Sequence, residues 1–249
     1  MLVRTQDRTA GDVLDRPVWT ALTTRHRRFA QSAGAARCFP EDIGPFAALR
    51  DDGRDSLRGL AVLAAARKAG LTLMQAGKPA YPDALRCVFA APGVQMIAER
   101  AFIFPDPRGA DRLTDADAAE MLALAQLTRP GPFGTETHRL GSFWGLRDQC
   151  GHLVAMAGER LKQPGYTEIS GVCVHPAHRG RGHAARLVAI VGAGIQARGE
   201  IPYLHAVADN LAAIGLYRKL GFRIRRDMEI VRLERQPDAE GLPGPPSPP

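Results

Sequence analysis

The sequence has no apolar run long enough to cross a bilayer and no secretory signal at its N-terminus. Its longest apolar candidate covers residues 187–195, whereas a transmembrane helix needs about 20 apolar residues. The first twelve residues also lack the basic-then-apolar order of a secretory signal peptide. These absences predict a cytoplasmic protein with no membrane partner.

Cysteines and aromatic residues are both scarce. The four cysteines lie far apart and form no C-x-x-C pair, which argues against a structural zinc site or a disulfide framework. Aromatic residues account for 6% of the chain and are not interleaved with a basic stripe, as a single-strand nucleic-acid binder requires. We therefore expect neither a metal site nor a nucleic-acid partner.

The net charge of +7 is concentrated toward the C-terminal end of the chain. Residues 171–235 contain eleven Lys and Arg but five Asp and Glu. Such an excess attracts an anionic ligand, for instance a phosphorylated cofactor, although a solvated basic surface gives the same count. Composition leaves both interpretations open, and the motifs must distinguish them.

Proline and glycine divide the chain into four parts. Residues 105–109 (P-D-P-R-G) are typical of a linker, and the proline-rich tail at 237–249 should be disordered because it has almost nothing to bury. Residues 1–104 are predicted to form a small α/β region without a catalytic constellation. Its predicted helices cover residues 18–31 and 54–68, and its predicted strands cover residues 36–39, 71–74 and 94–98.

Residues 110–236 show clearer periodicity and an informative order of elements. A strand, a helix and a loop precede three consecutive strands, and two helix–strand units follow. Thr114 is expected to cap the first helix. The predicted strands cover residues 111–114, 142–147, 152–161, 166–174, 203–207 and 222–233, and the two later helices cover residues 182–198 and 210–220.

The junction after the strand at 166–174 predicts an anion site. Residues 179–184 (R-G-R-G-H-A) fit the pattern R-x-x-G-x-A and follow V-x-V-x-P. The first N–H groups of a helix have no partner within the helix and favour an anion, and glycines let the backbone approach phosphates closely. Pro176 cannot donate to a sheet ladder, so strand pairing should lapse there and leave a gap. The pattern predicts a site for a pyrophosphate-bearing cofactor.

A second motif lies about thirty residues further along the chain. Residues 210–222 read N-x-x-A-x-x-L-Y-x-x-x-G-F, which is typical of an amphipathic helix that Gly221 ends. Tyr217 lies on this helix. A phenol with an ordinary pKa near 10 remains protonated at neutral pH, so this side chain can supply a proton.

Residues 172–222 resemble the two main cofactor motifs of the GNAT superfamily, whose members use acyl-CoA. The strand and helix at 110–119 also match the family's opening, so the resemblance covers about residues 110–235. It implies an α/β (α+β) fold with a mixed, mostly antiparallel sheet flanked by helices. Residues 1–104 would then be a degenerate copy of the same fold or a cap that shapes the acceptor site.

The resemblance also implies a function, namely an acetyl-CoA-dependent N-acetyltransferase in which a primary amine attacks the thioester directly. The strand backbone would pair with the pantetheine arm, the loop amides would hold the pyrophosphate, Asn210 would contact the region near the thiol, and Tyr217 would protonate the sulfur. The implied cofactor-binding residues are Val172, Cys173, Val174, Arg179, Gly180, Arg181, Gly182, His183, Ala184 and Asn210.

Three residues compete for the role of general base. Glu168 is the first choice because similar enzymes often place a carboxylate on this strand, and Glu159 and His205 are rivals. Cys173 lies inside an apolar strand and is expected to be a buried hydrophobe, not a nucleophile.

The acceptor is not determined by the sequence. We expect the loop at 128–133 and the neighbourhood of Glu159 to select it. The acyl-chain preference and the formation of a homodimer stay open. The alternative function is a catalytically inactive module that binds or senses acyl-CoA.

Overall fold

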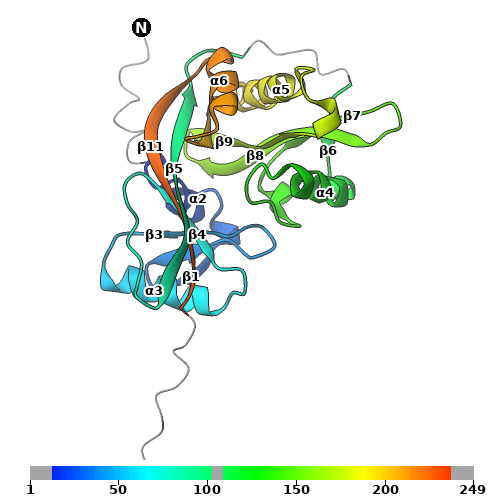
Figure 1. Ribbon diagram of the computed structural model, residues 1–249. Coiled ribbons are helices and arrows are strands. Elements are labelled where there is room, and N and C mark those ends of the chain that lie inside the picture. Colours follow the sequence, from blue (N-terminus) through cyan, green and yellow to red (C-terminus); the bar gives the residue numbers. More distant parts are fainter. Residues whose placement is uncertain (1–12, 103–108, 237–249) are drawn as a thin grey trace, which may run out of the picture.

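The computed structural model describes residues 13–102 and 109–236 (Figure 1). The predicted tail at 237–249 and the predicted linker at 105–109, apart from Gly109, lie outside the described residues. In Figure 1 the first part of the chain (blue to cyan) forms the lower body and the later part (green to orange) forms most of the upper body. One sheet of eleven strands runs through both, in the order β1-β2-β3-β4-β11-β5-β10-β9-β8-β7-β6.

The ladders are antiparallel except for β3–β4 and β9–β10, which are parallel. This mixed, mostly antiparallel sheet with flanking helices confirms the predicted fold class. The strands are β1 (Gln31–Ala33), β2 (Ala36–Cys38), β3 (Phe46–Leu49), β4 (Leu71–Gln75), β5 (Leu85–Ala98), β6 (Asp111–Leu113), β7 (Phe143–Arg147), β8 (Leu153–Gln163), β9 (Tyr166–Val174), β10 (Ile201–Val207) and β11 (Phe222–Arg235). The helices are α2 (Pro17–Thr23), α3 (Arg54–Ala65), α4 (Ala118–Thr128), α5 (His183–Ala197) and α6 (Leu211–Lys219), with 3-10 turns at Arg27–Phe29, Asp115–Asp117, Thr137–Leu140 and Pro176–His178.

The element order predicted for residues 110–236 is confirmed. The structure gives β6-α4-β7-β8-β9-α5-β10-α6-β11, with bounds close to those expected from the hydrophobic pattern. Thr114 was expected to cap the helix, but it caps the 3-10 turn that precedes α4, in a capping box with Asp117, and Asp117 is the N-cap of α4. Local signals were therefore sufficient for this half of the chain.

The predicted helix at 18–31 is wrong. It divides into α2 and a separate 3-10 turn at Arg27–Phe29. The hydroxyls of Thr20, Thr23 and Thr24 each donate to the backbone carbonyl four residues earlier. Threonines that bond back to the backbone in this way weaken a helix, and three of them lie in this short segment.

The long strand β5 joins the two bodies. It pairs with β11 along its whole length and with β10 near its end, so a strand from the first part of the chain lies between two strands of the later part. The sequence predicted only residues 94–98 of it, because Pro92 and Gly93 are unusual inside a strand. One continuous sheet therefore contains strands from both parts of the chain. The division into two domains at residues 105–109 stays a prediction from the sequence.

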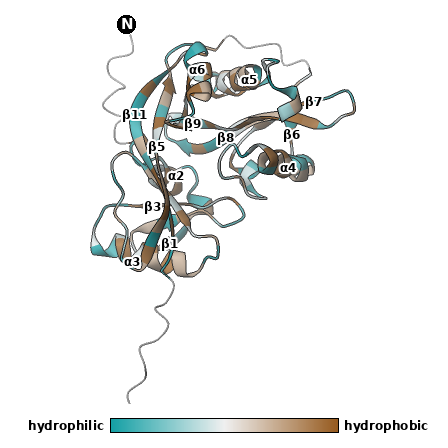
Figure 2. Ribbon diagram, in the orientation of Figure 1, coloured by the Kyte–Doolittle hydropathy of each residue, from teal (hydrophilic) through white to brown (hydrophobic). Residues whose placement is uncertain are grey.

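Helices cover both faces of the upper sheet. Leu187, Val191 and Ile195 of α5 pack with Ala155 and other residues on one face, in a cluster that also includes residues of α6. Met121 and Leu124 of α4 pack on the opposite face. Figure 2 shows apolar residues (brown) along the central strands and hydrophilic residues (teal) along the upper part of β11. Among the described helices, none combines the length and apolarity that are needed to cross a membrane.

Candidate active site

Strands β9 and β10 separate beside the predicted cofactor loop. Their parallel pairing ends at Tyr203↔Glu168, although β9 continues to Val174 and β10 to Val207. A register shift between β8 and β9 accompanies the separation, at a point where Gly171 has a φ of 63°. A Cβ at Gly171 would also lie 3.0 Å from the ring of Phe143, so the bulge requires glycine for two reasons. The backbone at 172–174 is thereby released from pairing with β10.

The predicted anion loop begins where β9 ends. Gly180 and Gly182 both have a φ of 76°, a conformation that glycine adopts easily. Gly182 is the N-cap of α5 and provides no side-chain cap. The first N–H groups of this fifteen-residue helix are therefore available to an anion at the mouth of the gap.

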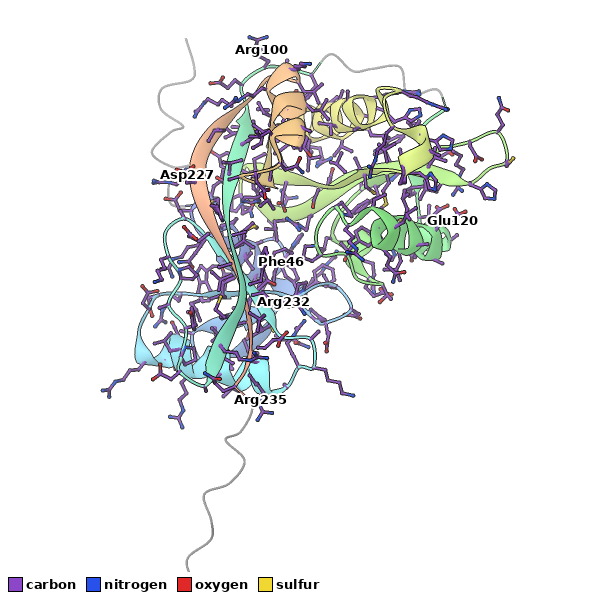
Figure 3. The ribbon with its side chains drawn as sticks, viewed as in Figure 1. Phe46, Arg100, Glu120, Asp227, Arg232 and Arg235 are labelled. Atoms are coloured by element: carbon purple, nitrogen blue, oxygen red, sulfur yellow. The ribbon has the colours of Figure 1, made fainter. Side chains whose placement is uncertain are left out.

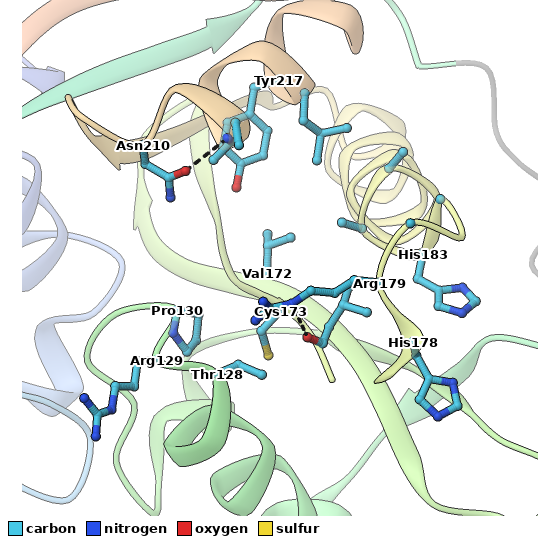
Figure 4. Close-up of a pocket in the computed structure, with 18 residues that line it drawn as sticks. Thr128, Arg129, Pro130, Val172, Cys173, His178, Arg179, His183, Asn210 and Tyr217 are labelled. Carbon is cyan, nitrogen blue, oxygen red and sulfur yellow. Dashed lines mark hydrogen bonds between the residues drawn. The ribbon is translucent and has the colours of Figure 1, made fainter. Parts of the chain in front are cut away.

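A cavity of about 520 Å³ lies between the separated strands, the loop and α6 (Figure 4). Nine of the ten residues predicted to bind the cofactor line it, and Arg181, which is exposed, does not. The nine are Val172, Cys173, Val174, Arg179, Gly180, Gly182, His183, Ala184 and Asn210. The structure thus brings together residues from two separate motifs, while their contacts with a cofactor stay a prediction.

Tyr217 stands at the end of this cavity away from the loop. Its side chain is buried, and its hydroxyl points into the cavity (Figure 4). Burial raises the pKa of Tyr217 to about 12, so the phenol keeps its proton at neutral pH. The ring packs against Phe222 with centroids 6.1 Å apart, which fixes its direction. The position is suitable for a proton donor.

Asn210 has a structural role that the motif did not reveal. Its side-chain oxygen accepts a hydrogen bond of 3.1 Å from the backbone N–H of Ala213, and so caps α6 (Figure 4). It also lines the cavity. An N-cap at this point fixes where the helix begins and hence where Tyr217 lies.

A second cavity of about 700 Å³ adjoins the first. Tyr217, Val172 and Arg129 line both, so the two cavities meet at the phenol. The second extends toward the lower body, where Phe46 and Arg232 contribute to its wall; Figure 3 shows both at the waist of the molecule. The loop at 128–133, which was expected to select the acceptor, contributes four residues to the wall of this second cavity, namely Arg129, Pro130, Gly131 and Pro132.

Glu168 is placed differently from the prediction. It is completely buried and lines neither cavity. Arg160 donates to its two oxygens at 2.7 and 2.8 Å, and the ring of His205 lies 2.7 Å from one of them. Burial alone would raise the pKa of Glu168, but the ion pair with Arg160 and the bond to His205 lower it to about 2. Such a carboxylate is a weak and inaccessible base, and its contacts favour a role in holding Arg160 and His205, while the identity of the base stays a prediction.

Glu159 and His205, the two rival bases, also have side-chain partners. Glu159 is buried against Lys162 at 2.6 Å and Arg198 at 2.8 Å, and it lines neither cavity. The expectation that its neighbourhood selects the acceptor therefore finds no support. His205 does line the second cavity, but its Nδ1 faces Glu168 and its Nε2 lies 2.9 Å from the side-chain nitrogen of Gln95. Both ring nitrogens of His205 therefore already have a side-chain partner.

Cys173 lies on the other face of β9 from the two valines. It belongs to the core cluster under α4, and burial raises its pKa to about 11. A buried thiol of this kind is inert, in agreement with the expected packing role.

Sequence reasoning included Arg129 in the predicted selecting loop at 128–133 but gave this residue no role of its own. Among the described residues it is the one non-glycine residue with a positive φ, at 51°, and it ends α4 by donating its N–H to Ala125. The signal was the following Pro130, since a residue before proline is disfavoured in the helical conformation. Strained backbone of this kind often occurs at functional sites.

A separate group of potential metal ligands occupies the β7–β8 turn, outside both cavities. Asp148, Cys150 and His152 bring ligand atoms within 4.8 Å of one another. The carboxylate of Asp148 accepts the N–H groups of the other two residues at 2.9 Å each. This is the ordinary chemistry of a turn, which accounts for the cluster.

Comparison with known proteins agrees with this geometry. The model of the FR47-like protein family, which is related to GNAT, matches residues 143–231. A crystal structure named as an acetyltransferase of the GNAT family from Novosphingobium aromaticivorans is 40% identical over 90% of this chain and 98% of its own, with a TM-score of 0.81. The chain belongs to the GNAT family.

Two more distant structures share the fold of this GNAT protein. A GCN5-related N-acetyltransferase from Kribbella flavida is 18% identical and covers 88% of this chain and 95% of its own, with a TM-score of 0.60. A GCN5-related N-acetyltransferase-like protein from Streptococcus suis is 16% identical and covers 95% and 100%, with a TM-score of 0.57. No protein with a curated description matches the chain.

Proposed function

We propose that this GNAT protein transfers the acetyl group of acetyl-CoA to a primary amine by direct attack. One observation carries the proposal: the gap between β9 and β10 connects the start of α5, which has no side-chain cap, at one end with the buried phenol of Tyr217 at the other. We call the cavity in this gap the donor cavity and the adjoining one the acceptor cavity.

The donor cavity suits an extended ligand with a diphosphate at one end. The backbone at 172–174 would pair with the pantetheine amides as a neighbouring strand does, because β10 has already turned away. The first turn of α5, with Arg179 beside it, would hold the pyrophosphate. This order leaves the thioester near Tyr217, where the two cavities meet.

The chemistry follows from this placement. The lone pair of a neutral amine attacks the thioester carbonyl carbon, so that a C–N bond forms while the C–S bond breaks. The leaving thiolate takes the proton of the Tyr217 hydroxyl, and the amine nitrogen releases a proton to water, from which the phenolate is reprotonated. No covalent enzyme intermediate is needed, in keeping with the buried position of Cys173.

The first part of the chain would act as a cap on the acceptor site. Phe46, Thr72 and Met74 line the acceptor cavity, which supports this proposal over a copy of the fold with its own site. The cytoplasmic location and the homodimer stay predictions.

Thiol release tests the proposed function. The full chain is mixed with acetyl-CoA and a panel of primary amines, and the acetylated product is identified by mass spectrometry. Release of free thiol that depends on an amine supports the transferase. Thermal stabilisation by acetyl-CoA without thiol release for any amine would instead indicate the acyl-CoA sensor.

A further inference from the structure

We infer that the acceptor is an amine that also carries a carboxylate, namely a free amino acid with an apolar side chain, and that Arg129 binds the carboxylate. This inference rests on the proposed function and specifies its acceptor. It depends on the charge, the apolar surface and the connectivity of the acceptor cavity.

The charged residues that line the acceptor cavity are all basic. Arg129, Arg160 and Arg232 lie in its wall, and no Asp or Glu is among the described residues that line it. A cavity of this kind attracts an anionic group and provides no carboxylate to hold an ammonium group. A polyamine or an aminoglycoside would bring several positive charges into this field without a partner, which disfavours it.

The three arginines differ in how far their charge is already balanced. Arg160 is paired through two hydrogen bonds with Glu168 and stacks on Phe46, with its guanidinium carbon 4.6 Å from the ring centroid. Arg232 donates to the carbonyl of Ala69 and has Glu234 at 3.8 Å.

Arg129 has no carboxylate within ion-pair distance in the described part of the chain, although its side chain is exposed and solvated. Its charge is the one left to bind an anionic ligand. A guanidinium matches a carboxylate with two parallel hydrogen bonds.

The position of Arg129 favours the acceptor over the donor. It lines both cavities, as Tyr217 does, and so lies at the junction of the proposed donor and acceptor sites. Figure 4 shows Arg129 on the opposite side of the donor cavity from Arg179 and His183, where the diphosphate is proposed to bind, with its guanidinium pointing away from that cavity. Its left-handed backbone and the following Pro130 fix the point at which the side chain leaves the main chain, beside this junction. From this junction, an acceptor that carries both an amine and a carboxylate can reach the guanidinium and the thioester together.

Apolar side chains form the rest of the wall. Phe46, Met74 and Ile230 line the interior, and Phe89 and Val207 line the cavity while remaining 52% and 37% exposed. Large apolar side chains left exposed beside a cavity indicate a ligand that covers them. An amino acid with an apolar side chain satisfies both the charge and this surface.

The decisive experiment compares L-leucine with leucinamide, isoamylamine and spermidine as acceptors, in the wild type and in Arg129→Gln. We expect kcat/KM to be at least about tenfold higher for leucine than for each other amine, because a hydrogen-bonded carboxylate contributes binding of this order. Arg129→Gln should raise KM for leucine at least about tenfold while leaving KM for acetyl-CoA and for leucinamide nearly unchanged. Arg58→Gln, at an exposed arginine of α3 outside both cavities, is the matched control.

Equal or better turnover of an uncharged or cationic amine overturns the inference while the transferase stands. An equal effect of Arg129→Gln on leucine and leucinamide does so too. If no amine releases thiol, the proposed function fails, and the inference is judged separately by calorimetric titration of leucine into the protein saturated with CoA. Binding of leucine but not leucinamide, lost in Arg129→Gln, supports it; binding of neither refutes it.

Discussion

The donor cavity and the acceptor cavity meet at one phenol but are built in different ways. Most of the donor cavity comes from residues 172–217, where a strand, a loop and two helices follow one another along the chain. The acceptor cavity shares residues of β9 and α6 with it, and the rest of its wall comes from β3, β4, β5, the loop after α4, β8, β10 and β11, which are distant in sequence. The residues of a contiguous motif can be recognised together in the sequence, whereas residues that are distant in sequence form a cavity wall only after the sheet has folded. The donor end is consequently the part that a sequence can identify.

The largest expected effect comes from Tyr217, one of the residues that line both cavities. Tyr217→Phe removes the proposed proton donor and keeps the ring, so kcat should fall by about 10²- to 10³-fold while acetyl-CoA binding changes little. Steady-state kinetics and calorimetry with CoA measure the two quantities. Tyr81→Phe, at a tyrosine packed in the lower body, is the control. Equal loss of turnover and binding would count against the acid role.

The next effect tests whether Glu168 belongs to the scaffold. Glu168→Gln leaves Arg160 buried without a charge partner, which should cost about 3–5 kcal/mol in the free energy of unfolding at neutral pH. Denaturant titration measures it. Glu120→Gln, at an exposed pair with Arg147, should cost about 1 kcal/mol or less. Unchanged stability with a large loss of kcat would restore Glu168 as the base.

The same pair predicts a pH dependence. The pKa of Glu168 is lowered from 4.5 to about 2 in the folded protein. Its stabilising contribution is therefore complete above pH 4.5 and is lost as the pH falls toward 2. The difference in unfolding free energy between wild type and Glu168→Gln should shrink over this range. A difference that stays constant with pH would contradict the assignment.

Acetyl-CoA binding in the donor cavity should depend more on the backbone conformation of its glycines than on its side chains. Gly182→Ala forces a Cβ into a φ of 76° at the start of α5, and relief of this strain would turn the amides away from the diphosphate. Since the strain is roughly 1–2 kcal/mol, KM for acetyl-CoA should rise about tenfold. Gly199→Ala, with a φ of 75° and equally open surroundings, lies outside both cavities and is the matched control. Similar KM values in the two variants would argue against an amide site.

Residues on the two sides of the site explain what the sequence could and could not predict. The patterns at 179–184 and 210–222 carry their own helix start, turn glycines and phenol, and these formed as expected. Glu168 looked suitable as a base because its own strand leads to the cofactor. Its pairing with Arg160 depends on a second register shift between β8 and β9, between Glu159 and Lys162, which no local pattern indicates.

The residues that line the acceptor cavity could not be predicted from the sequence for a related reason. Phe46 and Arg232 come together only because β3 pairs with β4 and β4 with β11. The strand β3 was missed altogether, since its four residues are buried on both faces and do not alternate. The one local trace of the acceptor site was the Arg–Pro step after α4, which ends the helix and fixes Arg129 in place.

The smallest expected effect concerns a partly exposed side chain that lines the acceptor cavity. Phe89→Ser removes a half-exposed ring from the acceptor cavity, where a ligand would gain about 1 kcal/mol or less by covering it. KM for an apolar acceptor should rise up to about fivefold, with KM for acetyl-CoA unchanged. Val88→Ser alters the neighbouring residue of β5, which is 37% exposed and lines neither cavity. If both substitutions change acceptor KM alike, the effect belongs to the strand and not to the cavity. If Phe89→Ser instead changes KM for acetyl-CoA, the second cavity also takes part in binding the donor, and the two cavities do not bind donor and acceptor separately.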